Sequence, residues 1–178
     1  MMRSITLLSF AVLSGVAPSH SVATTAPSVL AADREIWTMV IGYVTAAAEQ
    51  VPDSSYAFRP APTVRTFGQL VAHIAGSQDM FCAQALGEQA HASDEVEKTI
   101  TGKAALVAAL EASTAHCKKA YAMTDADAMK RTVKTFAGER SALWALLYST
   151  VHDNEHYGNI VTYMRMLGMV PPSSQPSR

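Results

Sequence analysis

Two histidines near the end of the chain, His152 and His156, have the spacing of a metal-binding pair. Residues four apart on an α-helix project from the same side, so both imidazole rings can reach one divalent cation. The same side of the helix is otherwise mostly apolar, which directs it toward the protein interior; it carries Ala145, Ser149, Ile160, Tyr163 and Leu167. Two imidazoles buried together are costly without a partner, and either a metal ion or a set of hydrogen-bond acceptors removes that cost. The alternative is a pair of ordinary core or surface histidines.

A third histidine, His73, lies in an earlier segment at the edge of an apolar helical stripe. Two helices can therefore direct three imidazoles at one point. Zinc accepts three protein ligands and a water molecule in catalytic sites, and nickel and iron also accept imidazole. A metal in such an open site activates bound water or polarises a bound oxygen atom. We predict that His73, His152 and His156 bind one divalent metal ion.

The other histidines have simpler interpretations. His20 lies in the N-terminal leader described below, His91 is predicted to be a solvated loop residue, and His116 is predicted to lie at an exposed helix end. The run from His152 to His156 also fits the H-x-x-E-H pattern of inverted zinc peptidases. That class needs a distant downstream acid as its third ligand, and no acidic residue follows Glu155. We therefore interpret the match as coincidental.

The catalytic residues stay unassigned at this stage. Glu155 and Asp79 are acids on the same two predicted helices as the three histidines, but Glu155 projects about 100° away from His156. Tyr163, two turns beyond His156, is predicted to line the wall of a pocket.

Helical spacing dominates the elements that must position these side chains, and strand signals are scarce. Asp33 and Thr66 are the predicted caps of the first two helices. Only residues 132–136 hint at extended structure, and residues 88–100 and 125–127 are predicted to be polar connections. Four long helices are expected, over residues 33–50, 66–87, 101–123 and 141–167. The first half of the last helix is apolar almost all round and is predicted to be buried. The fold class is therefore all-α, a four-helix bundle.

Composition and the first residues set the class and compartment of the protein. The 178 residues include 14 Lys+Arg and 15 Asp+Glu, a net charge of −1 that argues against nucleic-acid binding. Residues 1–26 have the basic start, 12-residue apolar run and small-residue end of a secretory signal peptide. We expect an exported, periplasmic protein without a membrane segment after cleavage. One domain is predicted over residues 27–172, followed by a flexible tail over 173–178.

Two parts of the chain resemble the DinB/YfiT-like superfamily. The first runs from Val51-Pro52 through Phe58-Arg59-Pro60 to Arg65-Thr66-Phe67-Gly68-Gln69-Leu70-Val71-Ala72-His73-Ile74. The second runs from His152-Asp153-Asn154-Glu155-His156-Tyr157-Gly158-Asn159-Ile160 through Tyr163-Met164-Arg165 to Gly168-Met169-Val170-Pro171-Pro172. The resemblance implies a four-helix bundle with a long crossover between helices two and three. It also implies a three-histidine metal site matching His73, His152 and His156.

The resemblance further implies what the site would hold and how the chain assembles. Zinc or nickel is the expected ion, with iron and manganese as further candidates. A homodimer is expected, because dimers are common in the family. Some members are thiol-dependent transferases or isomerases, which work in the cytoplasm where small thiols are reduced. Export of this chain is a departure from that setting.

The two cysteines, Cys82 and Cys117, each lie about 16 residues into their predicted helices, roughly 24 Å along at 1.5 Å per residue. If the crossover makes the two helices parallel, the thiols lie at the same height. The sequence leaves two states open, a disulfide or two buried free thiols.

Three functional hypotheses follow. The first is a metal-dependent hydrolase or thiol-dependent transferase acting on a small molecule. The second is a non-catalytic metal-binding or stress-related dimeric module. The third is a structural bundle whose histidines are only core residues.

Overall fold

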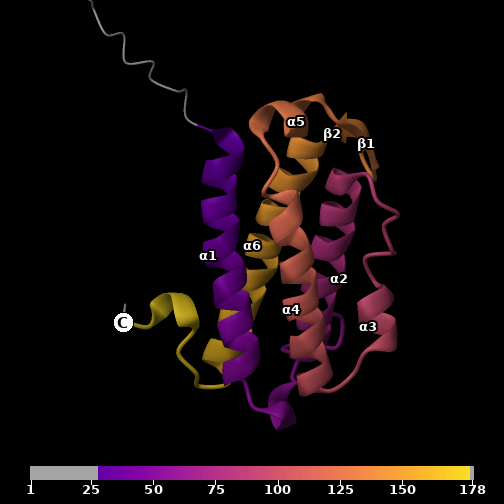
Figure 1. The fold of residues 1–178 in the computed structure, drawn as a ribbon. Coiled ribbons are helices and arrows are strands. Elements are labelled where there is room, and N and C mark those ends of the chain that lie inside the picture. Colours follow the sequence, from indigo (N-terminus) through magenta and orange to yellow (C-terminus); the bar gives the residue numbers. More distant parts are fainter. Residues whose placement is uncertain (1–27, 177–178) are drawn as a thin grey trace, which may run out of the picture.

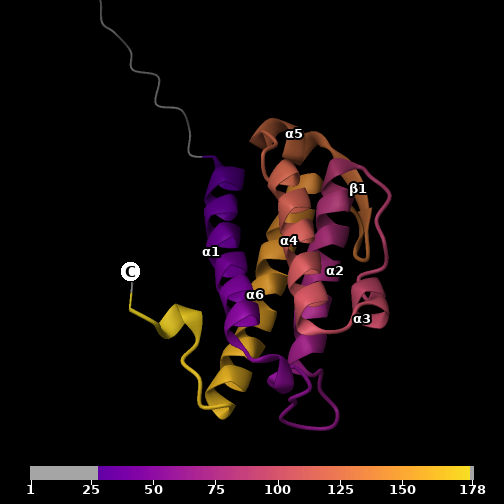
Figure 2. The same ribbon diagram turned by 60° about the horizontal axis from the view of Figure 1, so that its bottom comes forward.

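The computed structural model describes residues 28–176; the predicted signal peptide lies outside them. Four long helices form the bundle, and the structure confirms the expected all-α four-helix architecture (Figure 1). They are α1 (Val29–Gln50), α2 (Phe67–Leu86), α4 (Lys103–Ala120) and α6 (Ala142–Met166). In Figures 1 and 2, α2 and α4 run in one direction while α1 and α6 run in the other.

The parallel arrangement of α2 and α4 requires a long connection that returns along the bundle. This crossover includes the short helix α3 (Glu95–Thr99), which lies beside α2 (Figure 1). The approach is close at Gly76, where an added Cβ atom would collide with the carbonyl group of Ser93. A residue without a side chain at this position therefore lets the crossover pack directly on α2, one turn from His73.

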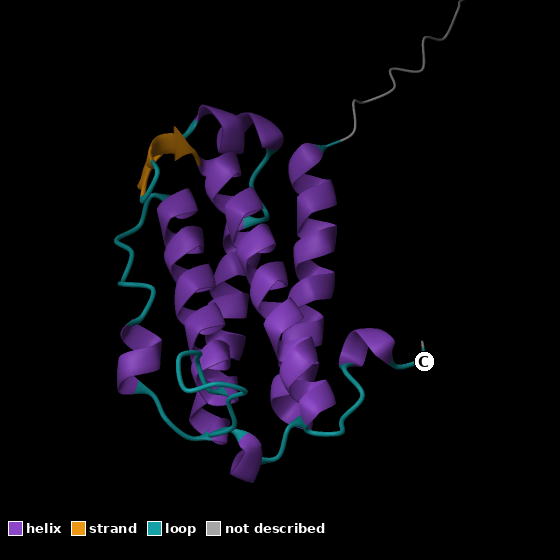
Figure 3. Ribbon diagram, turned by 180° about the vertical axis from the view of Figure 1, so that it is seen from behind, coloured by secondary structure: helices purple, strands orange, loops and turns teal. Residues whose placement is uncertain are grey.

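Besides α3, which lies within the connection expected over residues 88–100, two more short elements depart from the prediction of four long helices and scarce strand signals. Residues 125–127, expected to be a connection, begin helix α5 (Asp125–Lys130), whose N-cap Thr124 accepts a hydrogen bond from the Asp127 amide. The extended hint at residues 132–136 becomes an antiparallel hairpin of β1 (Thr132–Thr135) and β2 (Gly138–Ser141) (Figure 3). Single turns of 3₁₀ helix, η1 (Asp53–Ser55) and η2 (Pro172–Ser174), complete the described elements.

Asp33 is not the cap of the first helix, so that prediction was wrong. Ser28 caps α1 by accepting a hydrogen bond from the Ala31 amide. The carboxylate of Asp125 accepts further bonds from the Val29 and Leu30 amides at the same helix end. Asp33 instead lies one turn inside the helix with 4% of its surface exposed, and burial raises its pKa.

The cap predicted for α2, Thr66, and the start predicted for α6, Ser141, position the two helices that carry the histidines. Thr66 and Gln69 form a reciprocal capping box at the start of α2, and Gly87 ends the helix with φ +77°. Ser141 caps α6 by accepting a hydrogen bond from the Trp144 amide. These signals are local, which is why the sequence places them correctly.

The core lies between the four long helices. Trp37 of α1 stacks on Tyr121, at the end of α4, with ring centroids 4.5 Å apart, and the Tyr121 hydroxyl donates to the Leu146 carbonyl of α6. The first half of α6 was predicted to be buried on all sides, and that prediction was wrong for one side. Ala145 and Leu146 are fully buried, but Leu147 remains 38% exposed. The bundle has only three other long helices, so one side of α6 faces solvent.

A disulfide joins the two parallel helices. Cys82 of α2 and Cys117 of α4 are bonded, with Cα atoms 5.1 Å apart and both side chains fully buried. Of the two states that the sequence left open, the structure has the bonded one. The crossover makes α2 and α4 parallel, so cysteines at equal depth face each other.

His116 does not lie at an exposed helix end, contrary to the prediction. Its Nδ1 atom lies 2.7 Å from a carboxylate oxygen of Asp79, and its Nε2 atom lies 2.8 Å from one of Glu88. Burial disfavours the charged imidazole, but the hydrogen bonds and charges of the two carboxylates outweigh it and raise the pKa of His116. We call this group the Asp79–His116–Glu88 clasp; it ties α4 to α2 and to the start of the crossover.

The clasp makes stability depend on pH. Because the pKa of His116 is higher in the folded state, its contribution is complete below pH 6.5, the unfolded value, and is lost as pH rises through the folded value. We expect His116→Gln to lower the free energy of unfolding by about 0.5–1 kcal/mol at pH 6 and by less at pH 9. Urea denaturation at both pH values measures this, with His91→Gln as the exposed control. Equal losses at both pH values would contradict it.

The start of the predicted tail makes defined contacts. The Tyr157 hydroxyl hydrogen-bonds to Ser173, and the Gln175 side chain donates to Gln50 and to the Val170 carbonyl. Among the described residues, no helix is long and apolar enough to cross a membrane.

Candidate metal centre

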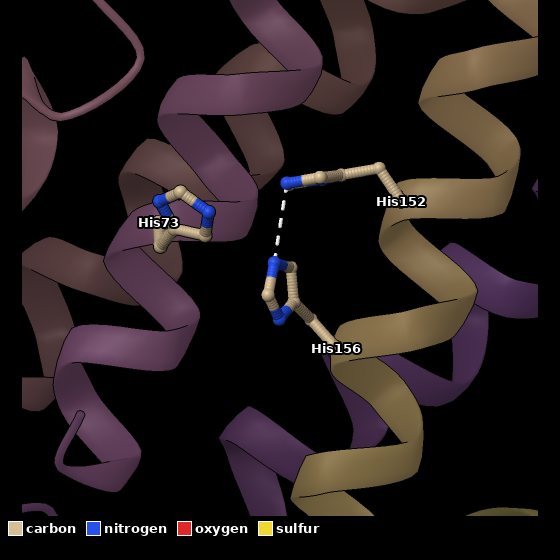
Figure 4. A group of neighbouring side chains, drawn as sticks. All are labelled: His73, His152 and His156. Carbon is tan, nitrogen blue, oxygen red and sulfur yellow. Dashed lines mark hydrogen bonds between the residues drawn. The ribbon is translucent and has the colours of Figure 1, made fainter. Parts of the chain in front are cut away.

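The three predicted histidines come together between α2 and α6. His73 lies two turns into α2, and His152 and His156 lie on consecutive turns of α6 with their rings directed at α2 (Figure 4). Their ring centroids are 5.1 Å apart for His73 and His152, 4.8 Å for His73 and His156, and 4.4 Å for the α6 pair. One nitrogen of each ring lies within 4.8 Å of the others.

These distances fit a shared cation. The Nε2 atoms of His152 and His156 are 3.1 Å apart. Two nitrogen ligands of a tetrahedral zinc ion, each about 2.1 Å from the metal, lie about 3.4 Å apart. The α6 pair is therefore already at ligand spacing, and His73 needs only a small side-chain adjustment. His73 and His152 are 12% and 13% exposed, so the cluster is sheltered but not sealed.

A polar group lies near the Nδ1 atom of each of the three rings. A Glu97 oxygen from α3 lies 3.8 Å from Nδ1 of His73, and an Asp153 oxygen lies 3.8 Å from Nδ1 of His152. The Asn159 amide nitrogen lies 3.4 Å from Nδ1 of His156. A carboxylate near Nδ1 orients a metal-binding histidine by accepting its N–H, which leaves Nε2 free for the metal. Glu97 and Asp153 lie on the correct side of His73 and His152 for this role, at a distance longer than a hydrogen bond. The Asn159 amide nitrogen can only donate to His156, so it does not have this role.

The surroundings of the cluster lower the pKa of two of its rings, His73 and His156. Burial, followed by the charge of nearby Arg65 and of the other two histidines, lowers the pKa of His73 to about 3. Burial and the charge of His152 lower the pKa of His156 to about 4. Because only a neutral imidazole has a free electron pair for a metal, both side chains are ready to act as ligands near neutral pH.

Asp153 is the most buried acid beside the cluster. It is fully buried and neither carboxylate oxygen has a hydrogen-bond partner among the described residues. Burial raises its pKa to about 6, against the opposing effect of His152. An unpaired buried carboxylate is costly, and a positive charge shared with His152 would offset that cost. The position of Asp153 is therefore a second observation that fits a cation at the cluster.

An aromatic wall borders the cluster on the His152 side. It is formed by Phe81 of α2, Phe136 at the hairpin tip, and Trp144 and Tyr148 of α6. The centroid of Phe81 lies 5.8 Å from that of His152, and Trp144 stacks on Tyr148 at 5.1 Å. The hairpin thus adds an apolar surface next to the histidines, with Phe136 itself 67% exposed.

A polar cavity of about 570 Å³ opens on the His156 side. Its lining includes His156 itself and residues of the segment before α2, of α2, of α3 and of α6: Arg59, Arg65, Gln69, Glu97, Asn159 and Tyr163. The volume suits a small organic molecule. The three-histidine cluster therefore borders this cavity on one side and the aromatic wall on the other.

Tyr163 lines this cavity, as predicted from its spacing, whereas the two acids singled out with it lie elsewhere. Glu155 is exposed on the outer side of α6, and Asp79 belongs to the clasp with His116. His91 is exposed, as expected. Sequence reasoning missed Glu97, Asp153 and Arg65 as neighbours of the histidines. Asp153 had one signal, an acid directly beside His152, while Glu97 and Arg65 depend on how the connections fold.

The comparisons with known structures agree with this fold. A DinB-like protein from Bacillus cereus has a TM-score of 0.67 at 18% identity, over 79% of this chain and 93% of its own. A DinB-like protein from Bacillus subtilis has a TM-score of 0.61 at 20% identity, over 80% and 99%. A mycothiol-dependent maleylpyruvate isomerase has a TM-score of 0.56 at 20% identity, over 78% and 67%.

Two further comparisons were made, with curated proteins and with family models. The search of curated proteins gives no match. A family model described as the DinB superfamily matches residues 37–160, a range that contains all three clustered histidines. This range covers most of the chain, as the resemblance in its two histidine segments implied. The chain belongs to the DinB superfamily.

Proposed function

We propose that this protein binds one divalent metal ion through His73, His152 and His156 and acts as a metal-dependent hydrolase or transferase on a small molecule. The observation that carries the proposal is the convergence of three sheltered imidazoles, two of them with a carboxylate oxygen 3.8 Å from Nδ1. An ion held there would supply Lewis acidity to a bound oxygen or sulfur atom.

The protein's own residues would provide binding and orientation. Glu97 and Asp153 would orient the rings of His73 and His152, and the aromatic wall shields one side of the cluster from water. The cavity at His156 leaves room for a substrate. This open space favours an enzyme over the alternative, a non-catalytic metal-binding dimeric module, because a purely structural metal site is closed by protein ligands.

Zinc and nickel are the proposed ions, since three imidazoles suit both, with iron and manganese as further candidates. Thiol-dependent transfer is the second candidate reaction, supported by the structural similarity to a mycothiol-dependent isomerase. We also propose that the protein is exported to the periplasm. The Cys82–Cys117 disulfide supports this, because such bonds persist in oxidising compartments. A homodimer stays a prediction.

Metal analysis of the purified, tag-free protein tests the proposal. We expect about one ion per chain after exposure to zinc or nickel, followed by turnover of one class in a panel of esters, lactones and thiol adducts. One ion without turnover would favour the non-catalytic module. A wild-type protein that binds neither ion would overturn the proposal and leave a structural bundle.

Glu97 gives a finer test because it contacts His73 without being a proposed ligand. We expect Glu97→Gln to weaken zinc affinity by about 10- to 100-fold, the range for partners that orient ligand histidines. Chelator competition measures the affinity. Glu95→Gln, two residues earlier on α3 and paired with His91, is the matched control and should bind zinc like the wild type. Wild-type affinity in Glu97→Gln would show that Glu97 has no orienting role.

A further inference from the structure

The cavity beside His156 contains two arginines and one acid. Arg59 and Arg65 come from the segment before α2, and Glu97 comes from α3. The Arg65 Nε atom donates to Glu97 over 3.0 Å, so one positive charge is already paired. The lining therefore carries a net charge of one positive unit, together with the amide groups of Gln69 and Asn159. A site of this charge suits a singly charged anion better than a doubly charged one.

Arg65 is held in place from three sides. The Tyr163 hydroxyl donates to its backbone carbonyl over 2.9 Å, Glu97 binds its Nε, and the next residue, Thr66, is the N-cap of α2. Its side chain is 39% exposed, so its terminal NH₂ groups remain accessible. No hydrogen bond from those groups is found within residues 28–176. A preorganised guanidinium with free donors is the group that binds carboxylates through paired hydrogen bonds.

The arginine lies close to the histidines. Arg65 and His156 line the same cavity, and the Glu97 carboxylate that pairs with Arg65 lies 3.8 Å from Nδ1 of His73. His156 is itself part of the cavity lining. A molecule whose anionic group contacts Arg65 would thus extend toward the histidine cluster.

We propose that this cavity is a carboxylate-binding subsite, so that the substrate is a small organic acid whose carboxylate pairs with Arg65 and Arg59. This inference rests on the proposed function for the role of the bound molecule, but the anion site itself can be tested without metal. Arg59 completes the site: its guanidinium lines the cavity and donates within its own loop, to the Pro62 carbonyl over 3.3 Å.

Calorimetric titration at low salt tests the subsite, with benzoate as the probe and benzamide as its uncharged isostere. Both are titrated into zinc-loaded and metal-free protein, and inorganic phosphate is titrated into the metal-free protein. We expect benzoate to bind more tightly than benzamide and phosphate. Arg65→Gln and Arg59→Gln should each weaken benzoate binding about tenfold or more, the loss of a charge-assisted contact. Arg165→Gln, an exposed arginine of α6 outside the cavity, is the matched control.

The outcomes separate the two proposals. Zinc binding without arginine-dependent benzoate binding overturns the subsite and leaves the proposed metal site intact. Arginine-dependent benzoate binding in a protein that binds no zinc supports the subsite and overturns the metal site. Benzoate binding that needs zinc but is unchanged in both arginine variants means direct attachment to the ion and overturns the subsite. Tighter binding of phosphate than of benzoate overturns the assignment to carboxylates.

Discussion

Replacing His152 with alanine is expected to lower zinc affinity by on the order of a thousandfold, well beyond the loss expected for an outer partner. His152 is one of three imidazoles in the cluster, and its Nε2 atom is 3.1 Å from that of His156. Without it, two protein ligands remain, and the buried Asp153 carboxylate loses the imidazole beside it. His73→Ala and His156→Ala should cause losses of the same order. Competition with a coloured chelator measures all three.

Two other histidine variants serve as controls for this experiment. His91→Ala removes an exposed loop side chain, and His116→Ala removes the clasp between α2 and α4. Both should keep one zinc ion per chain with the affinity of the wild type. If His73→Ala retained full affinity while the α6 variants lost it, the metal site would consist of α6 alone, and the three-histidine centre would be wrong.

The second large effect is expected from the disulfide. The double variant Cys82→Ala/Cys117→Ala should lower the free energy of unfolding by about 3–4 kcal/mol, the entropic value for a bond that closes a loop of this length. The two cysteines are 35 residues apart in the sequence, and the bond constrains the whole crossover in the unfolded chain. The midpoint of thermal unfolding should fall by about 10 °C.

The wild type provides its own control for this prediction. After reduction with dithiothreitol it should unfold at nearly the same urea concentration as the double variant, because both lack the covalent link. An oxidised wild type no more stable than the double variant would show that the bond does not form in solution. Mass spectrometry of the alkylated protein then reports whether both thiols are free.

The fold was predictable where its signals are local. The Thr66 capping box, Gly87 and Ser141 set helix ends through bonds to the nearest backbone groups, so their residue types suffice. The prediction for Asp33 was wrong because the residue type alone does not distinguish a helix cap from a buried acid inside the helix. That distinction depends on packing against other helices, such as the contact of Asp33 with Thr150 of α6. The sequence indicated the hairpin only weakly, because its two strands have four residues each and so show little alternation of polar and apolar residues.

The candidate site likewise contains residues that were predictable from the sequence and residues that were not. The three histidines were predictable because two share one helix face and the third lies on another amphipathic helix. The contacts of Arg65, Glu97 and His116 were not, because their partners come from segments 28 to 98 positions away in the chain. Polar side chains in connections have no periodicity that would reveal where they point.

The crossover packed on α2 separates the residues that would bind the metal from the carboxylate that lies beside them. The bundle supplies the imidazoles, but the carboxylate that faces His73 and pairs with Arg65 arrives on α3, packed against Gly76. The three histidines and the carboxylate of Glu97 thus lie in separate segments of the chain. Exchanging residues 88–102 between relatives of this fold should therefore retune affinity and selectivity while the helical frame stays the same.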